Sequence, residues 1–210
     1  ALRPTEGKAA AVAALPYDVV NREEAAAIGK ENPDSFLHVD RAEMDLSAET
    51  DLYDVKVYQK AKENLHKMEE TGVLVQDNKP CYYIYELVRK GKVQTGIAGC
   101  ASIDDYLNNV VKKHELTRSD KELDRINHVD VCDANTGPIY LACRYTDALS
   151  ALLEQWKKEH KAAYDFTEED EITHRVWVID GDEAISQIQG EMEKIPALYI
   201  ADGHHRAASA

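Results

Sequence analysis

Strand-like and helix-like segments alternate along the second half of the chain, and this alternation constrains the fold most strongly. Apolar runs rich in β-branched and aromatic residues predict strands at residues 137–145, 174–180 and 197–201. Between them, residues 147–160 and 182–195 carry apolar side chains at the spacing of one helix face. Helices that alternate with strands in this way are typical of α/β or α+β folds. We therefore expect a mixed sheet flanked by helices.

The first half predicts helices at residues 21–32 and 52–70. Asn21 followed three residues later by Glu24 forms a capping pattern, and Pro33 lies beyond the expected helix end. Residues 52–70 place apolar side chains on one helix face and stop before a glycine. Both segments are therefore predicted as helices.

Shorter segments complete the predicted secondary structure. Residues 35–39 predict a short strand, and residues 81–88 and 93–103 predict a hairpin. Residues 102–111 open with a capping pair, Ser102 and Asp105, and predict a short helix, while the alanine-rich residues 8–15 fit a helix or a strand. No repeat or low-complexity linker divides the chain. Within it we expect an N-terminal subdomain at residues 1–75 and a core at residues 76–210.

The charge balance excludes several kinds of partner. With 39 acidic against 25 basic residues, the net charge is −14, which repels a nucleic-acid backbone. The sequence has no run of 18 apolar residues to cross a membrane and no export signal, so a cytoplasmic protein is expected. The chain lacks an initial methionine and stops soon after Arg206, which suggests that the natural protein continues.

The four cysteines predict buried thiols. Cys81, Cys100, Cys132 and Cys143 lie in or beside apolar segments, and no two have the C-x-x-C spacing of many metal and redox sites. Neither a disulfide nor a zinc site of cysteines is therefore expected.

The sequence DGHHR at residues 202–206 joins a predicted strand to a run of small residues that predicts a helix. A glycine-bearing turn into a helix suits an anion, and His204, His205 and Arg206 strengthen this interpretation. Asp202 and Gly203 also fit an ordinary tight turn with solvated neighbours. Both interpretations stay open on this motif alone.

A second polar stretch covers residues 112–125. His114 and Glu115 form a usable acid/base pair, although such charged runs are usually solvated connections. Position 118 is Arg rather than His, so the zinc-protease pattern H-E-x-x-H fails. The common phosphate-loop, dinucleotide and serine-hydrolase motifs are also missing.

Further ligand contacts are possible at four other residues. Arg118 and Arg125 lie in the charged stretch, and Arg125 fits either a phosphate or carboxylate contact or a salt bridge on a helix surface. Tyr17 and Asp18 follow a proline and fit either a ligand contact or a structural turn. Three other histidines are interpreted as packing or surface residues rather than ligands: His38, His128 and His174.

Five motifs in a fixed order resemble a widespread bacterial family of unknown function. They are LPYDVV at 15–20, NPDSFLHVDRAEMDL at 32–46, HELT at 114–117, DR at 124–125 and LYIADGHHRAASA at 198–210. The HE and DGHHR motifs are in turn similar to those of the free serine kinases, in the ParB/sulfiredoxin-like superfamily. The resemblance implies a ParB/sulfiredoxin-like core with an N-terminal extension.

The resemblance also implies a function. Glu115, next to His114, would be the general base on the hydroxyl of L-serine, and residues 202–206 would hold the nucleotide phosphates. The implied cofactors are Mg²⁺ and ATP or ADP, with no metal ligand among the protein residues. The serine kinases are shorter, and the region around Tyr17 and Asp18 has no counterpart in them. The resemblance therefore leaves two alternatives open besides the same activity: a different substrate, or loss of the activity.

The sequence leaves three alternative functions. The first is a nucleotide-dependent phosphotransferase on a small hydroxylated molecule, with free L-serine as first candidate. The second is a nucleotide-binding regulatory module without phosphoryl transfer. The third is a metal-dependent hydrolase that uses His114, His204 and His205, ranked last because adjacent histidines rarely face one ion.

Overall fold

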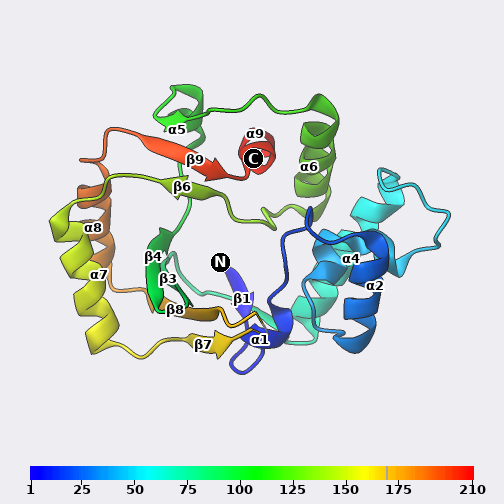
Figure 1. Ribbon diagram of the computed structural model, residues 1–210, viewed down its shortest axis with the longest axis horizontal. Coiled ribbons are helices and arrows are strands. Elements are labelled where there is room, and N and C mark those ends of the chain that lie inside the picture. The colour runs from blue at the N-terminus through cyan, green and yellow to red at the C-terminus, as the bar shows by residue number, and fades with distance from the viewer. Residues whose placement is uncertain (169) are drawn as a thin grey trace. The chain divides into compact units, whose positions relative to one another are not determined.

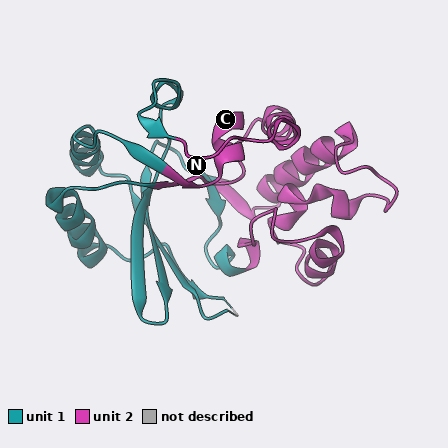
Figure 2. Ribbon diagram, turned by 45° about the horizontal axis from the view of Figure 1, so that its top comes forward, with its two compact units in different colours: residues 1–10, 76–112, 142–199 teal, residues 11–75, 113–141, 200–210 magenta. Residues whose placement is uncertain are grey.

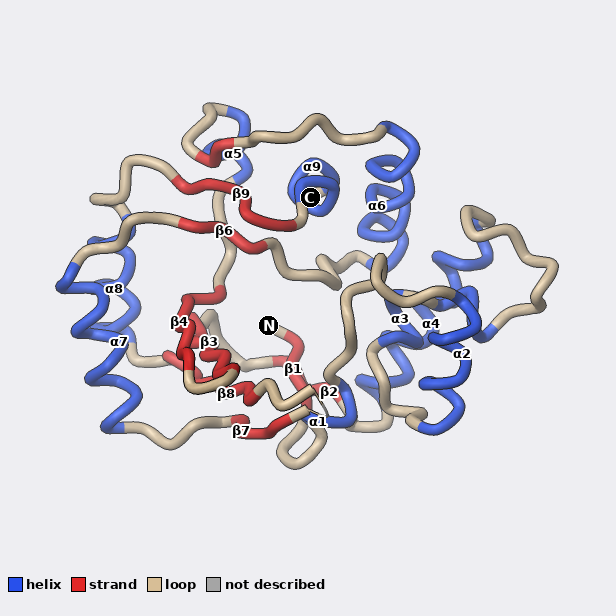
Figure 3. Tube along the Cα trace, in the orientation of Figure 1, coloured by secondary structure: helices blue, strands red, loops and turns tan. Residues whose placement is uncertain are grey.

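The computed structural model describes residues 1–168 and 170–210 and contains helices and several sheets (Figures 1 and 3). Its sheets include antiparallel and parallel strand pairs, so the predicted α/β or α+β class is confirmed. Within the described residues, no helix has the length and apolar content needed to cross a membrane.

The chain forms two compact units whose segments are interleaved (Figure 2). Unit 1 comprises residues 1–10, 76–112 and 142–199, and unit 2 comprises residues 11–75, 113–141 and 200–210. The predicted N-terminal region 1–75 thus contributes its first ten residues to unit 1 and the remainder to unit 2. Three of the crossings fall within strands, namely β2 (Leu74–Gln76), β6 (Tyr140–Ala142) and β9 (Leu198–Asp202).

The hairpin expected near residue 90 is present in unit 1. It pairs β3 (Tyr82–Arg89) with β4 (Lys92–Ala98), and Arg89 lies opposite Lys92. Lys90 and Gly91 form the two-residue turn with φ values of 49° and 75°. Positive φ at both positions is what a turn of this length requires to match the strand twist.

The hairpin belongs to a four-stranded antiparallel sheet of order β4-β3-β8-β7. The added strands are β8 (Thr173–Ile179), predicted from the sequence, and β7 (Tyr164–Thr167), which was not predicted. Three further strands also escaped prediction: β1 (Leu2–Pro4), β2 and β5 (Val111–Lys112).

The core of unit 1 lies between this sheet and two helices, α7 (Asp147–Glu159) and α8 (Asp182–Met192). Both helices were predicted, and Thr146 caps the first by accepting a hydrogen bond from the Leu149 N–H. Burial of apolar side chains from sheet and helices supplies most of the stability of such a layer. The buried members are Ile84, Leu149, Leu153, Trp177, Ile179, Ile188 and Ile195.

One buried carboxylate of unit 1 is held by two cations. Glu86 of β3 is 6% exposed and lies 2.8 Å from the Lys157 ammonium and 3.2 Å from the Arg175 guanidinium. Burial alone would raise the pKa of Glu86, but hydrogen bonds and charge from both cations outweigh burial and lower it. Glu86 is therefore a paired structural charge.

The segment predicted as a helix at 102–111 is shorter than expected. Ser102 caps α5 (Ile103–Leu107) by accepting from the Asp104 N–H, rather than through the expected pairing with Asp105. Asn109 has a φ of 61°, which breaks the helix, and Val111–Lys112 form β5 instead. In the small sheet of order β5-β9-β6, Val111 lies opposite the first residue of β9 in a parallel pair.

Unit 2 is helical. The predicted helices are present as α2 (Arg22–Glu31) and α4 (Val55–Glu70), and the capping box of Asn21 and Glu24 is complete. The charged stretch after residue 118, described above as a solvated connection, contains the helix α6 (Ser119–Cys132). The undecided alanine-rich segment contains a single helical turn, α1 (Ala9–Val12), at which the chain crosses between the units.

The short strand expected at residues 35–39 is wrong. The segment forms a helical turn, α3 (Leu37–Asp40), followed by the 3₁₀ turn η1 (Ala42–Asp45). Leu37 and Val39 alternate as in a strand, but both are buried because α2, α4 and η1 pack around this single turn. Such a short apolar run carries no periodicity that separates helix from strand.

The prediction of buried thiols holds for part of the cysteines. All four are free, and Cys132 is buried, which raises its pKa to about 11. Cys81 and Cys143 are half-buried, whereas Cys100 is exposed. Cys100 follows the end of β4, where the chain leaves the sheet and burial ends.

A buried polar network joins α3, α6 and the loop after α6. The His128 Nε2 lies 3.2 Å from the Thr136 hydroxyl, which donates to the Asp40 carboxylate at 2.9 Å. The side chains of His128 and Asp40 are 4% and 14% exposed. Burial raises the pKa of Asp40 to about 6 and lowers the pKa of His128 to about 4.

These opposite shifts should cancel in the pH dependence of stability. Around pH 5 the folded pair holds one proton on Asp40, and the unfolded pair, with ordinary pKa values of 3.8 and 6.5, holds one proton on His128. Folding then takes up no net proton at this pair. Its contribution to the free energy of unfolding is therefore nearly flat from about pH 4 to 6.

Replacing one partner should reveal the shift of the other. In Asp40→Asn, the unfolded His128 binds a proton that the folded one does not, so stability should fall as the pH drops from 6.5 toward 4. In His128→Gln, stability should instead fall as the pH rises from 3.8 toward 6, because the unfolded Asp40 has lost its proton in this range while the folded Asp40 still holds one. Urea unfolding across this range should give slopes that differ from the wild-type slope in opposite directions, each by up to ~1.4 kcal/mol per pH unit. Parallel slopes in the two variants would contradict the network.

Candidate functional site

The DGHHR turn is closed by its own arginine. Gly203 has φ 89° and ψ 36° and precedes the helix α9 (His204–Ser209). The Arg206 guanidinium donates to the Asp202 carboxylate at 2.6 Å and to the Pro138 carbonyl. Both terminal nitrogens of the predicted phosphate clamp are thus bonded within the protein, and its side chain is only 16% exposed.

Gly203 is required by this closure. A left-handed φ of 89° is strained for any residue with a Cβ. A Cβ at this position would also lie 3.1–3.2 Å from atoms of the Arg206 guanidinium. The glycine therefore lets the arginine fold back over the turn.

His205 connects the turn to the start of α6. Its Nε2 accepts a hydrogen bond from the backbone N–H of Arg118 at 3.1 Å. The Arg118 guanidinium pairs with Asp120 at 2.7 Å, and both side chains are more than half exposed. His205 therefore acts as a positioning residue that holds the DGHHR turn against Arg118, which directly follows the HELT motif.

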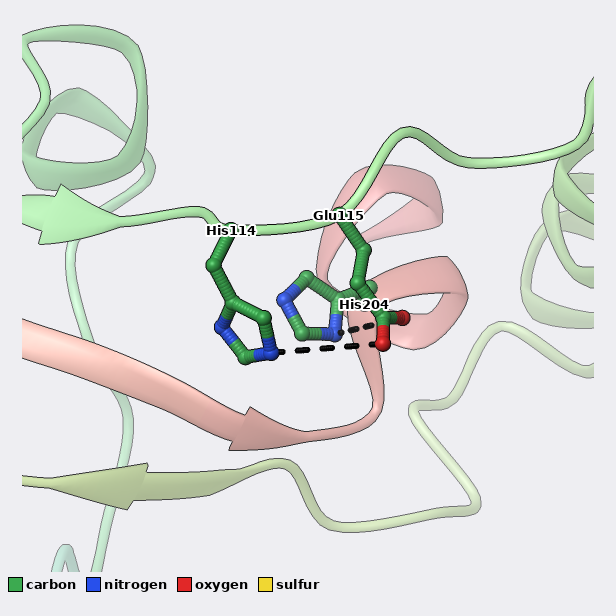
Figure 4. Close-up of side chains that lie close together, drawn as sticks. All are labelled: His114, Glu115 and His204. Carbon is green, nitrogen blue, oxygen red and sulfur yellow. Dashed lines mark ion pairs between the residues drawn. The ribbon is translucent and has the colours of Figure 1, made fainter.

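His204 turns the other way and meets the HE pair, as Figure 4 shows. The Glu115 carboxylate lies 3.5 Å from the His204 Nδ1 and 3.9 Å from the His114 Nε2. The two imidazole rings meet edge to face, with centroids 4.4 Å apart. The structure thus brings together residues 114–115 and the 202–206 turn, as expected for one site.

The three side chains differ in burial. His204 is 7% exposed, and its Nε2 is buried without a hydrogen-bond partner. The side chains of His114 and Glu115 are 61% and 63% exposed. The group therefore has an enclosed imidazole on one side and an open, solvent-facing side where a small molecule can approach.

The chemistry of the group suits proton transfer or metal binding. A carboxylate beside imidazoles can accept a proton from a hydroxyl. One ligand atom from each of His114, Glu115 and His204 lies within 4.8 Å of the others, which is close enough to surround a metal ion. Mg²⁺ prefers oxygen ligands, so two imidazoles and one carboxylate do not fit the magnesium expected from the sequence.

Arg125 belongs to a buried ion pair. Its guanidinium donates to the adjacent Asp124 at 2.9 and 3.1 Å, and Tyr58 donates to the other oxygen of Asp124 at 3.0 Å. Of the two interpretations considered above, the structure shows the salt bridge, but Asp124 and Arg125 are each 8% exposed, so the pair is buried rather than on the helix surface. Burial and the negative charge of Asp124 raise the pKa of Tyr58 to about 12.

Tyr17 covers this ion pair. The Arg125 guanidinium lies 4.3 Å from the centre of the Tyr17 ring, a cation–π contact. Burial raises the pKa of Tyr17 above its ordinary value, against the positive charge of Arg125. Asp18 is exposed in the turn that the Val19 N–H closes on the Pro16 carbonyl. Tyr17 and Arg125 are thus in contact, although nothing in the sequence pairs them.

The remaining histidines have partners, as predicted for packing residues. His38 lies 2.8 Å from Asp45, and His128 belongs to the buried network with Asp40. His174 lies 2.7 Å from the Tyr85 hydroxyl and stacks on Phe166. Each of the three therefore has a partner, although the buried Nε2 of His174 makes no hydrogen bond and lies 3.6 Å from a Glu168 oxygen.

Sequence reasoning paired His114 with Glu115 but did not single out His204 as the histidine of the turn that meets Glu115. It paired His204 with His205 because they are neighbours, whereas their side chains have different partners in the structure. The available signal was an HE pair in one motif and a histidine at the start of a short helix in the other. The network of Asp40 and Thr136 carried no signal in the sequence.

Comparison with known proteins yields one match. A family described as "Protein of unknown function (DUF1015)" matches residues 1–210. No curated protein matches, and no solved structure matches.

The closure of the turn predicts a specific effect of adding one methyl group. Gly203→Ala should lower the free energy of unfolding more than Gly72→Ala, since both glycines have positive φ but only Gly203 faces a guanidinium. The φ strain should cost ~1–2 kcal/mol at each site, and the displaced Arg206 should add ~1–3 kcal/mol at Gly203. Urea unfolding of the two variants measures the difference. Equal losses of unfolding free energy in the two variants would show that the position of Arg206 does not require residue 203 to lack a Cβ.

Proposed function

The chain belongs to the DUF1015 family of proteins of unknown function, and we propose that it is a nucleotide-dependent phosphotransferase acting on a small hydroxylated molecule. Free L-serine is the first candidate acceptor, on the resemblance of the HE and DGHHR motifs to those of the free serine kinases. The ParB/sulfiredoxin-like relationship is part of the same proposal.

One observation carries this proposal. The Glu115 carboxylate lies 3.5 Å from His204 of the DGHHR turn, although the two residues come from motifs far apart in the sequence. A general base and the groups that hold the transferred phosphoryl must reach the same small substrate. The contact supports a shared site for the two motifs.

Glu115 has the surroundings that a general base requires. Its side chain is 63% exposed and can reach a bound hydroxyl, and the neighbouring imidazoles can orient it. Proton removal makes the acceptor oxygen a better nucleophile toward the terminal phosphorus. The acceptor oxygen then forms the new P–O bond as the bond to the nucleoside diphosphate or monophosphate breaks.

The phosphate contacts differ from those expected from the motif. Arg206 and Arg125 donate to Asp202 and Asp124, so a nucleotide would have to displace a carboxylate to reach either guanidinium. Arg118 also donates to a carboxylate, that of Asp120, but these two side chains are 72% and 51% exposed, so their ion pair is the most easily displaced of the three. The backbone N–H of Arg118 is bonded to His205 of the turn. We therefore assign the first phosphate contact to Arg118. Mg²⁺ would enter with the nucleotide phosphates.

The base assignment predicts a loss of turnover without loss of nucleotide binding. Glu115→Gln keeps the shape of the side chain but removes the basic oxygen, so turnover should fall by ~10²-fold or more. Nucleotide affinity, measured by calorimetry, should stay near wild type. Mass spectrometry after incubation with Mg²⁺, ATP or ADP and L-serine, L-threonine or small sugars detects the product. Glu69→Gln, an exposed glutamate on α4, is the matched control.

Two outcomes would argue against the enzyme. Tight nucleotide binding without a phosphorylated product from any acceptor would favour a regulatory module, in which phosphate is bound but not transferred. Turnover that is equal in Glu115→Gln and Glu69→Gln would remove Glu115 from the chemistry.

A further inference from the structure

We propose that His114, Glu115 and His204 bind a divalent first-row transition-metal ion, with Zn²⁺ as the representative case. This site differs from the Mg²⁺ that accompanies a nucleotide. It stands on the geometry of three side chains of unit 2 and does not rest on the proposed phosphoryl transfer.

The donor atoms already converge on one point. The two measured separations, 3.5 Å from Glu115 to His204 and 3.9 Å from Glu115 to His114, are longer than hydrogen bonds. The side chains therefore face one another at ion-pair rather than hydrogen-bond distances, and Figure 4 marks both contacts with dashed lines. A metal ion between them would replace these long contacts with ligand bonds of about 2.0–2.2 Å after small side-chain movements.

His204 supplies a second, independent observation. It is a polar side chain more than nine-tenths buried, and its Nε2 lacks a hydrogen-bond partner among the described residues. Burial of an imidazole with an unsatisfied nitrogen costs free energy, because water no longer solvates it. A metal bond at the other ring nitrogen, the Nδ1 that faces Glu115, would stabilise the enclosed imidazole, although it would leave Nε2 without a partner.

The ligand types select the class of metal. Two imidazoles and one carboxylate match the preferences of zinc and its neighbours, whereas Mg²⁺ and Ca²⁺ prefer oxygen ligands. Three protein ligands leave a tetrahedral ion with an open position. The exposure of His114 and Glu115 would place that position toward solvent, where water or a hydroxyl can bind.

The neighbouring histidine is excluded from the ligand set. His205 accepts a hydrogen bond from the backbone of Arg118, so its Nε2 is used in holding the two motifs together. The structure thus separates the adjacent histidines of DGHHR into a ligand, His204, and a positioning residue, His205. A metal ion here would make Glu115 a ligand in place of the general base proposed above, and the ion would then acidify a bound hydroxyl itself.

Calorimetry with Zn²⁺ alone tests the site without nucleotide or acceptor. After treatment with a chelator, the protein should bind one Zn²⁺ per chain, and Mg²⁺ under the same conditions should give no saturable binding. His114→Ala should weaken Zn²⁺ binding at least ~10-fold, since one of three ligands is lost. His66→Ala, which removes an exposed histidine of α4, should bind Zn²⁺ as wild type does.

His114 is the variant of choice because its side chain is exposed, so its removal should leave the fold intact, which circular dichroism checks. Cobalt provides a second readout, as Co²⁺ in a tetrahedral site absorbs visible light strongly and His114→Ala should abolish the band. The absence of saturable Zn²⁺ binding would overturn the proposal, and so would equal affinities in the His114→Ala and His66→Ala variants. A protein that binds Zn²⁺ but transfers no phosphate would keep the metal site and reject the proposed function.

Discussion

The candidate site depends on the ion pair through which Arg206 closes its own turn. The guanidinium holds Asp202 and the Pro138 carbonyl, and Gly203 makes room for it with a positive φ. This closure fixes where α9 begins and so directs His204 toward Glu115 and His205 toward Arg118. An arginine in a motif predicted to bind phosphate is usually considered for its ligand. Here the same residue first determines the backbone on which the other side chains are presented.

The pairing of cations with carboxylates recurs through both units. Glu86 holds Lys157 and Arg175 in unit 1, and Asp124 holds Arg125 in unit 2. In a chain with 39 acidic and 25 basic residues, an arginine close to a carboxylate is more common than one left for an anion. An anionic ligand must therefore compete with internal carboxylates, whereas a cation enters a negative field. The exposed Glu115 is well placed to attract such a cation.

Local patterns predicted the parts of the fold that local interactions determine. The capping box at Asn21 and the apolar spacing of α4 depend on residues within a few positions, and both were confirmed. The turn at Leu37–Asp40 was missed because its burial comes from helices elsewhere in unit 2. The same limit applies to the site. The sequence showed that Glu115 and His204 belong to chemically useful motifs, but the choice of His204 over His205 depends on which side of α9 meets residues 114 and 118.

The interleaving of the two units affects the order in which the protein can fold during synthesis. Unit 2 needs residues 11–75, 113–141 and 200–210, so its first helices leave the ribosome long before their last partner exists. Contacts between segments so distant in sequence slow folding, because long loops must close first. The imidazole of His204 can reach Glu115 only after all of unit 1 has been translated. Acquisition of the candidate site is thereby tied to synthesis of the whole intervening chain, and a nascent protein cannot assemble it early.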